Sequence, residues 1–334
     1  MKSKPKVTVI VGPTASGKSE LAISIAKKFS GEIVSADSRQ VYRGMDIGTA
    51  KPELVKKNGA LFSRGVRHHL LDIRDINQTF TAKEFKDLAE KAIKEILNRG
   101  KLPIVVGGTG LYIKALTDNL NLATTPPNEK LRKKLQNELN RRGVTALYER
   151  LVCLDPEAAY IVDRKNPRRV IRALEIALTQ KSSLEKLRTG GEVPFVFLQI
   201  GLRRSSEILK KKIERRAVAM VSAGLVKEVK NLVKKYSPDL EPLSAIGYRE
   251  ICEHLQGKIP LAEAVRKMQR NTWRYAKKQM AWFARNKRVR WVKKGKEAEA
   301  LVRKFLARSS KHSRGRASSV NPVRSPTRPV RDMK

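Results

Sequence analysis

The chain has 334 residues, enough for about two domains, and 40% of them are hydrophobic, which supports a folded protein. It carries 72 Lys and Arg against 32 Asp and Glu, a formal net charge of +40, so nucleic acid is the first candidate partner, with a generally basic proteome as the plain alternative. Two distant cysteines exclude a disulfide framework and a zinc site, and no run approaches the roughly 18 apolar residues of a membrane span. We therefore expect a cytoplasmic protein.

The first predicted element is a buried strand over Val7–Val11, and residues from Glu20 onward have the apolar spacing of a helix. The loop between them matches G-x-x-x-x-G-K-[ST] in the strand–loop–helix context that this phosphate-binding motif requires. Backbone N–H groups of such a loop converge on an anion, Lys18 adds a positive charge, and the Ser19 hydroxyl can hold Mg²⁺. The pattern does not specify which phosphate compound binds. Its residues are Gly12, Pro13, Thr14, Ala15, Ser16, Gly17, Lys18 and Ser19.

A second short strand is predicted over 31–36, and Asp37 follows at its carboxyl end. In an open parallel sheet, ligand groups collect at that edge, so we expect Asp37 to face the phosphate-binding loop. From its position alone, Asp37 is equally suited to be a partner of bound magnesium, a general base or the N-cap of the next turn. The glycine-containing stretch Tyr42–Pro52 is predicted to be a loop over the site.

His68 and His69 are adjacent, and neighbouring residues of a strand point to opposite faces, so we favour a structural role for this pair over a metal site. Asp72 is an alternative acidic partner for magnesium. A helix over 81–98 and a buried strand over 102–106 follow. That strand is followed by glycines and Thr109, where an ATPase often has a magnesium-binding acid, which argues against ATP hydrolysis.

From residue 126 the pattern changes to charged helices without strands. Arg168, Arg169 and Arg172 crowd the first turns of a helix that opens at Asn166-Pro167, where cations oppose the helix dipole. A phosphate backbone would relieve that repulsion, whereas the plain alternative is a solvated face. This segment is predicted to be a helical insertion.

After the insertion, 195–200 is a strand that returns the chain to the sheet, and 206–235 is a long helix with a break near Gly224. The apolar spacing of this helix predicts that Ile208 is one of its buried residues. Lys212 and Arg216 lie four residues apart on one face of that helix, a spacing that suits a diphosphate between them. The basic helix over 262–287 contains aromatic residues suited to packing or to stacking on bases.

Together these elements predict an α/β fold, a P-loop NTPase-like parallel sheet flanked by helices, with an all-helical insertion domain. We assign 1–125 to the first part of the core, 126–192 to the insertion and 193–307 to the second part of the core with the C-terminal helices. Residues 308–334 are predicted to be a basic, disordered tail with a nonspecific attraction to RNA.

Eight segments, in order over about residues 6–292, resemble the tRNA dimethylallyltransferase (isopentenyltransferase) family. They are GPTASGKSELA at 12–22, ADSRQVYRGMDIGTAKP at 36–52, HHLLDI at 68–73, GGTGLYIKAL at 107–116, RRVIRALEI at 168–176, GL..EV at 224–229, AIGYRE at 245–250 and RNTWRYAKKQMAWF at 270–283. The sequence departs from the usual family pattern at Lys212, Arg168 and Ala281, where Arg, Gln and Thr are common.

The resemblance implies that the loop binds dimethylallyl diphosphate and that the enzyme prenylates N6 of the adenosine 3′ of the anticodon in tRNA. It implies that Asp37 is the general base, that the loop residues and Arg216 bind the diphosphate, and that the insertion grips the anticodon stem-loop. We expect a monomer that uses Mg²⁺; a P-loop nucleotide kinase or NTPase acting on or with RNA is the alternative. The implied tRNA contacts are Asp37, Ser38, Arg39, Gln40, Thr109, Arg132, Arg168, Arg169, Val170, Ile171 and Arg172.

Overall fold

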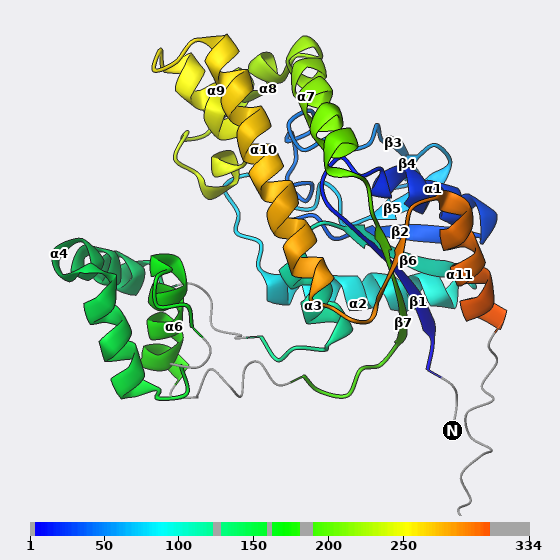
Figure 1. The fold of residues 1–334 in the computed structure, drawn as a ribbon, viewed down its shortest axis with the longest axis horizontal. Coiled ribbons are helices and arrows are strands. Elements are labelled where there is room, and N and C mark those ends of the chain that lie inside the picture. The colour runs from blue at the N-terminus through cyan, green and yellow to red at the C-terminus, as the bar shows by residue number, and fades with distance from the viewer. Residues whose placement is uncertain (1–3, 123–127, 159–161, 181–189, 308–334) are drawn as a thin grey trace, which may run out of the picture.

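The computed structural model describes residues 4–122, 128–158, 162–180 and 190–307, and Figure 1 shows their arrangement. Eight strands form one sheet in the order β3-β4-β5-β2-β6-β1-β7-β8. The pairs from β5 to β8 are parallel, whereas β3 and β4 form an antiparallel hairpin that extends the sheet beyond β5. The predicted P-loop-like α/β fold is confirmed, but the hairpin was not predicted. The strands are β1 (Lys6–Val11), β2 (Gly31–Ser35), β3 (Val55–Lys57), β4 (Ala60–Ser63), β5 (Val66–His69), β6 (Leu102–Gly107), β7 (Val196–Leu202) and β8 (Val289–Val292).

Both faces of the sheet are covered, as the continuous apolar runs of its central strands require. One face packs against α1 (Lys18–Lys28) and α11 (Gly295–Ala307), with Ile10 and Ile104 in that core. The opposite face, which includes Val9 and Val105, packs against α2 (Ala82–Asn98) and α3 (Gly110–Thr117). The helix predicted over 81–98 is confirmed, and a capping box between Thr81 and Glu84 fixes its start.

A third layer of helices lies beyond the carboxyl ends of the strands (Figure 1). It consists of α7 (Ser206–Ser222), α8 (Leu225–Lys235), η1 (Glu241–Ser244), α9 (Tyr248–Leu255) and α10 (Leu261–Ala284). The predicted break is confirmed, because Gly224 adopts a φ of 101° between α7 and α8. Ile208 was predicted to be buried, but its side chain is 48% exposed on the outer side of α7. A core around Tyr42, Met45 and Tyr248 joins this layer to the 42–52 loop.

The helices α4 (Glu129–Leu154) and α6 (Pro167–Gln180) lie within the range predicted to be an insertion and stand apart from the sheet in Figure 1. They pack on each other around Leu135, Leu151 and Leu174. The segments that lead into and out of them are joined by a bridge between Leu120 and Gly190 and by a 3.1 Å hydrogen bond from Gly191 N to Asn119 O.

Two further sequence-based expectations concern the C-terminal tail and membrane-spanning segments. The basic tail predicted to be disordered, residues 308–334, lies outside the described residues. Among the helices that the structure describes, none combines the length and the apolar character needed to cross a bilayer.

Candidate active site

A cavity of about 390 Å³ opens at the carboxyl edge of the sheet, where the β1–α1 loop, the end of β2 and α7 meet. It brings the predicted base into the same space as the predicted diphosphate ligands and Lys212. Ligand sites of open α/β sheets lie at this edge, so the location follows from the fold. Lining residues from the predicted set are Thr14, Ala15, Gly17, Lys18, Ser19, Asp37, Gln40 and Arg216.

The β1–α1 loop has the backbone shape of an anion cradle. Gly12 and Gly17 have φ values of 151° and 92°, and a Cβ on Gly12 would lie 3.0 Å from the Leu202 carbonyl oxygen. Ala15 has a φ of 62°, which L residues rarely adopt and which is typical of strained functional loops. Since α1 begins at Lys18, its unpaired N-terminal N–H groups and its dipole favour an anion in the cavity.

Two partly buried cations, Lys18 and Arg216, lie near Asp37 in this cavity, whose lining also includes the exposed Lys212 and Glu20. Burial lowers the pKa of Lys18 to about 8, with Asp37 opposing the shift and Arg216 adding to it. Burial also lowers the pKa of Arg216, and Asp37 again opposes the shift. Arg216 donates a 2.7 Å hydrogen bond to Thr14 Oγ1, which holds the guanidinium against the loop. Since Lys18, Arg216 and Lys212 outnumber the two carboxylates of the lining, the cavity favours a ligand that carries more than one negative charge.

The two oxygens of the Asp37 carboxylate differ in their surroundings. Oδ1 accepts hydrogen bonds from the backbone N–H groups of Arg39 and Gln40, at 2.9 and 3.4 Å, and so fixes the turn after β2. Within the described residues, Oδ2 accepts no hydrogen bond, and Asp37 lines the cavity. The capping and general-base interpretations are therefore compatible, because each uses a different oxygen.

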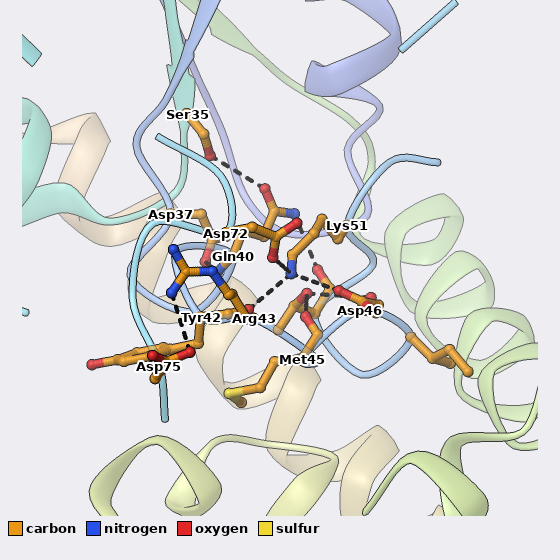
Figure 2. A network of polar contacts seen from close by, with 12 residues as sticks. Ser35, Asp37, Gln40, Tyr42, Arg43, Met45, Asp46, Lys51, Asp72 and Asp75 are labelled. Carbon is orange, nitrogen blue, oxygen red and sulfur yellow. Dashed lines mark hydrogen bonds and ion pairs between the residues drawn. The ribbon is translucent and has the colours of Figure 1, made fainter. Parts of the chain in front are cut away.

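The 42–52 loop forms one wall of the cavity and is tied down from inside, as Figure 2 shows. The Gln40 amide donates to Thr49 O and Ala50 O at 3.2 and 3.3 Å. Lys51 Nζ, almost fully buried, bonds to Tyr42 O at 2.9 Å and to the carboxylates of Asp46 and Asp72. Asp72 lines a separate cavity together with Lys51, so its partner is this ammonium and not the phosphate-binding loop.

The same loop is held from outside by Glu228 of α8. One carboxylate oxygen accepts from Asp46 N and Ile47 N at 3.2 and 2.8 Å, and the other accepts from Gly48 N and from the Tyr248 hydroxyl at 3.2 and 2.6 Å. A side chain on Gly48 would collide with the Tyr248 ring. These contacts explain the GL..EV and AIGYRE segments as supports for the cavity wall.

Sequence reasoning did not identify Gln279 of α10, which joins the phosphate-binding loop to the end of β6. Its Oε1 accepts from Thr14 N at 2.8 Å, and its Nε2 donates to Gly108 O at 2.9 Å. Thr109, a predicted tRNA contact, accepts from Ser38 N at 3.1 Å and so links β6 to the Asp37 turn. A glutamine within a basic, aromatic helix was the only local signal.

The predicted tRNA contacts on the insertion are four arginines and two apolar residues, and the arginines differ in their surroundings. Arg168 and Arg169 are exposed on the first turn of α6. Arg132 and Arg172 both donate to the buried carboxylate of Glu175, at 3.0 and 2.6 Å.

Two further members of the predicted set, Val170 and Ile171, are buried in the core of the insertion. Their apolar side chains hold α6 in place, and the contact with tRNA that the resemblance implies for these two residues stays a prediction.

The two histidines point to different surroundings: His69 serves the sheet, whereas His68 also lines the site cavity. His69 Nε2 and Glu32 Oε2 are 2.7 Å apart, and Arg99 also donates to Glu32. His68 is 8% exposed, and its Nε2 lacks a partner among the described residues. No cluster of three His, Cys, Asp or Glu at metal-binding distance occurs within the described ranges. In the cavity, the Ser19 hydroxyl and the Asp37 carboxylate are oxygen groups of the kind that Mg²⁺ prefers.

With this geometry established, comparison with known proteins identifies the family. A sequence model of the IPP transferase family matches residues 40–287. The tRNA dimethylallyltransferase of Pelotomaculum thermopropionicum is 43% identical over 293 residues, which are 87% of this chain and 91% of the relative. This chain belongs to the tRNA dimethylallyltransferase family.

Solved structures of tRNA dimethylallyltransferases support the assignment. The full-length tRNA isopentenylpyrophosphate transferase of Bacillus halodurans superposes with a TM-score of 0.65 at 40% identity, covering 91% of this chain and 96% of that one. A eukaryotic dimethylallyltransferase acting on tRNA gives a TM-score of 0.63 at 29% identity, covering 84% and 70%. The similarity extends across almost the whole described chain, so the fold is that of the family.

Proposed function

We propose that this protein transfers a dimethylallyl group from dimethylallyl diphosphate to N6 of the adenosine 3′ of the anticodon in tRNA and releases diphosphate. The observation that carries the proposal is that Asp37 lines the same cavity as the β1–α1 loop and Arg216. The relatives are named tRNA dimethylallyltransferases, and the solved eukaryotic relative acts on tRNA, which supports the transfer of a dimethylallyl group to tRNA. A net charge of +40 supports a polyanionic substrate.

The chemistry requires a base at one end of the cavity and anion stabilisation at the other. The lone pair of an exocyclic adenine amine is delocalised into the ring, so a carboxylate must take its proton as the C–N bond forms. Asp37 Oδ2 is available for that proton while Oδ1 keeps the turn in shape. As the allylic C–O bond breaks, Lys18, Arg216 and the N–H groups at the start of α1 stabilise the departing diphosphate.

Magnesium fits this donor set. The Ser19 hydroxyl lines the cavity at the first turn of α1 and would hold Mg²⁺ together with diphosphate oxygens. The ion would neutralise part of the charge on the leaving group.

The adenine must leave its stack to enter the cavity, which costs a few kcal/mol and less in a loop than in a duplex. A single-stranded anticodon loop is therefore a suitable target, and we expect a cytoplasmic monomer.

Replacing Asp37 tests the proposal. Asp37→Asn keeps the Oδ1 acceptor for Arg39 N but removes the basic carboxylate, so transfer to tRNA should fall by about 10²- to 10⁴-fold while tRNA still binds. Asp75→Asn is a matched control, because Asp75 pairs with Arg43 outside the cavity and should keep full activity. The assay is mass analysis of tRNA nucleosides after incubation with dimethylallyl diphosphate.

Retention of most of the activity by the Asn variant would rule out Asp37 as the base. Release of phosphate from ATP without any prenylated nucleoside would instead favour a P-loop NTPase.

A further inference from the structure

Arg39 lies two residues after the proposed base and is bound by an acid from a distant part of the chain. Its Nη1 and Nη2 donate to Glu241 Oε2 and Oε1 at 2.7 and 2.6 Å, a two-bond fork. Glu241 is the first residue of the 3-10 helix η1, in the helical layer beyond the strand ends. A guanidinium binds a carboxylate and a phosphate in this same paired geometry, so one group can replace the other on Arg39.

The burial of the two partners shows which of them can move. The Glu241 side chain is 72% exposed, whereas that of Arg39 is 27% exposed. Pro242 and Leu243, which follow Glu241, are buried and keep the backbone of η1 in place. Glu241 can therefore leave the fork by rotating its side chain, without disturbing the core.

The charges around Glu241 belong to both parts of the molecule that are expected to bind RNA. The hydrogen bonds from Arg39 hold the pKa of the Glu241 carboxyl below its usual range against the opposing effect of burial, and Arg168 of the insertion adds to the shift. Thus the carboxylate interacts with one arginine of the Asp37 turn and with one of α6. An anion at this position is attracted from two sides.

We propose that Glu241 occupies, in the RNA-free protein, the position that an RNA phosphate takes on Arg39, so that RNA binds there by displacing this carboxylate. This inference rests on the proposed function for the nature of the substrate. Binding at Arg39 is then an exchange of one anion for another, and a phosphate that makes no other contact gains little by it. RNA that also fills the Asp37 cavity gains the remaining contacts but must displace the same carboxylate, so Glu241 lowers the affinity of every RNA that uses Arg39 by a similar factor.

The test compares Glu241→Gln with Asp239→Asn, a neighbouring exposed acid with no recorded ion pair within the described residues. Both changes remove one negative charge, but only the first frees Arg39. We would measure the dissociation constants of unmodified tRNA and of an oligouridylate by fluorescence anisotropy, over a range of salt concentrations.

Relative to Asp239→Asn, we expect Glu241→Gln to bind oligouridylate and tRNA each about two- to fivefold more tightly, the size of effect expected for an exposed ion pair. The slope of log K against log salt should steepen by about 0.7, one phosphate contact on a single strand. In an Arg39→Gln background the two acid variants should bind alike.

Weaker binding by Glu241→Gln would overturn the inference, because it would mean that Glu241 supports Arg39 in the bound state. Binding equal to that of Asp239→Asn would overturn it as well, since Arg39 would then not exchange anions. Prenyl transfer is measured separately: if the wild-type protein transfers no prenyl group but the binding pattern holds, the proposed reaction fails and the exchange at Arg39 stands.

Discussion

Replacing Gln279 by alanine should weaken both the fold and the phosphate-binding loop. The side chain is 6% exposed and satisfies two backbone groups, Thr14 N and Gly108 O. A buried backbone group left without a partner costs about 1–3 kcal/mol, so two such groups predict a loss of about 2–6 kcal/mol in the free energy of unfolding. Since Thr14 would lose its anchor, we also expect the dissociation constant of inorganic diphosphate to rise about tenfold, equivalent to about 1.4 kcal/mol.

Urea denaturation measures the first effect and isothermal titration calorimetry the second. Gln269→Ala is the matched control on the same helix, because Gln269 only donates to Glu214 O, a carbonyl within α7, at 3.2 Å. The free energy of unfolding of Gln269→Ala should be lower than that of the wild-type protein by less than about 1 kcal/mol. Gln279→Glu separates the two bonds, since it keeps the acceptor for Thr14 N and loses the donor to Gly108 O. A Gln279→Ala variant within about 0.5 kcal/mol of the wild-type protein would refute the reasoning.

Two predictions concern pH. Because burial lowers the pKa of Lys18 to about 8 and a bound diphosphate favours the charged form, the dissociation constant of inorganic diphosphate should rise above pH 8, by up to about tenfold per unit. Lys18→Arg is the control, because its guanidinium stays charged, so its calorimetric titration shows only the pH dependence caused by the ionisation of diphosphate. An equal rise of the dissociation constant in that variant would contradict the role of Lys18. Burial, then the charges of His69 and Arg64, lowers the pKa of His68 from 6.5 to about 4. Between pH 4 and 6.5 the unfolded chain binds more protons than the folded chain. The contribution of His68 to the free energy of unfolding therefore grows from pH 4 to 6.5 and is lost on acidification. In urea denaturation His68→Gln should show a pH slope smaller by up to about 1.4 kcal/mol per unit, and unchanged slopes would contradict the burial argument.

The parts of the site that could be predicted are those encoded locally. The β1–α1 loop, the location of Asp37 after β2 and the break at Gly224 each follow from a few consecutive residues, and the structure has them where expected. The resemblance to a known family supplied the reaction, which spacing alone did not.

The contacts that sequence reasoning missed join residues far apart in the chain. Glu228 reaches the 46–48 loop across about 180 positions, and Gln279 reaches Thr14 across 265. No local pattern distinguishes these side chains from solvated ones. The β3–β4 hairpin was missed because Val55–Lys57 is exposed and has no apolar alternation. Ile208 was assigned to the core from helical spacing, but α7 packs with its other faces.

The paired segments at Asn119 and Gly191 have a consequence for how the molecule is put together. The chain leaves the core and returns to it at neighbouring points, so the α4–α6 unit is an insertion that does not interrupt the core. If the unit were removed, a short turn could join the two remaining ends. The α4–α6 unit and the core that contains the Asp37 cavity can therefore accumulate mutations separately. A change in the surface of α4 or α6 does not require the residues that line the Asp37 cavity to be replaced.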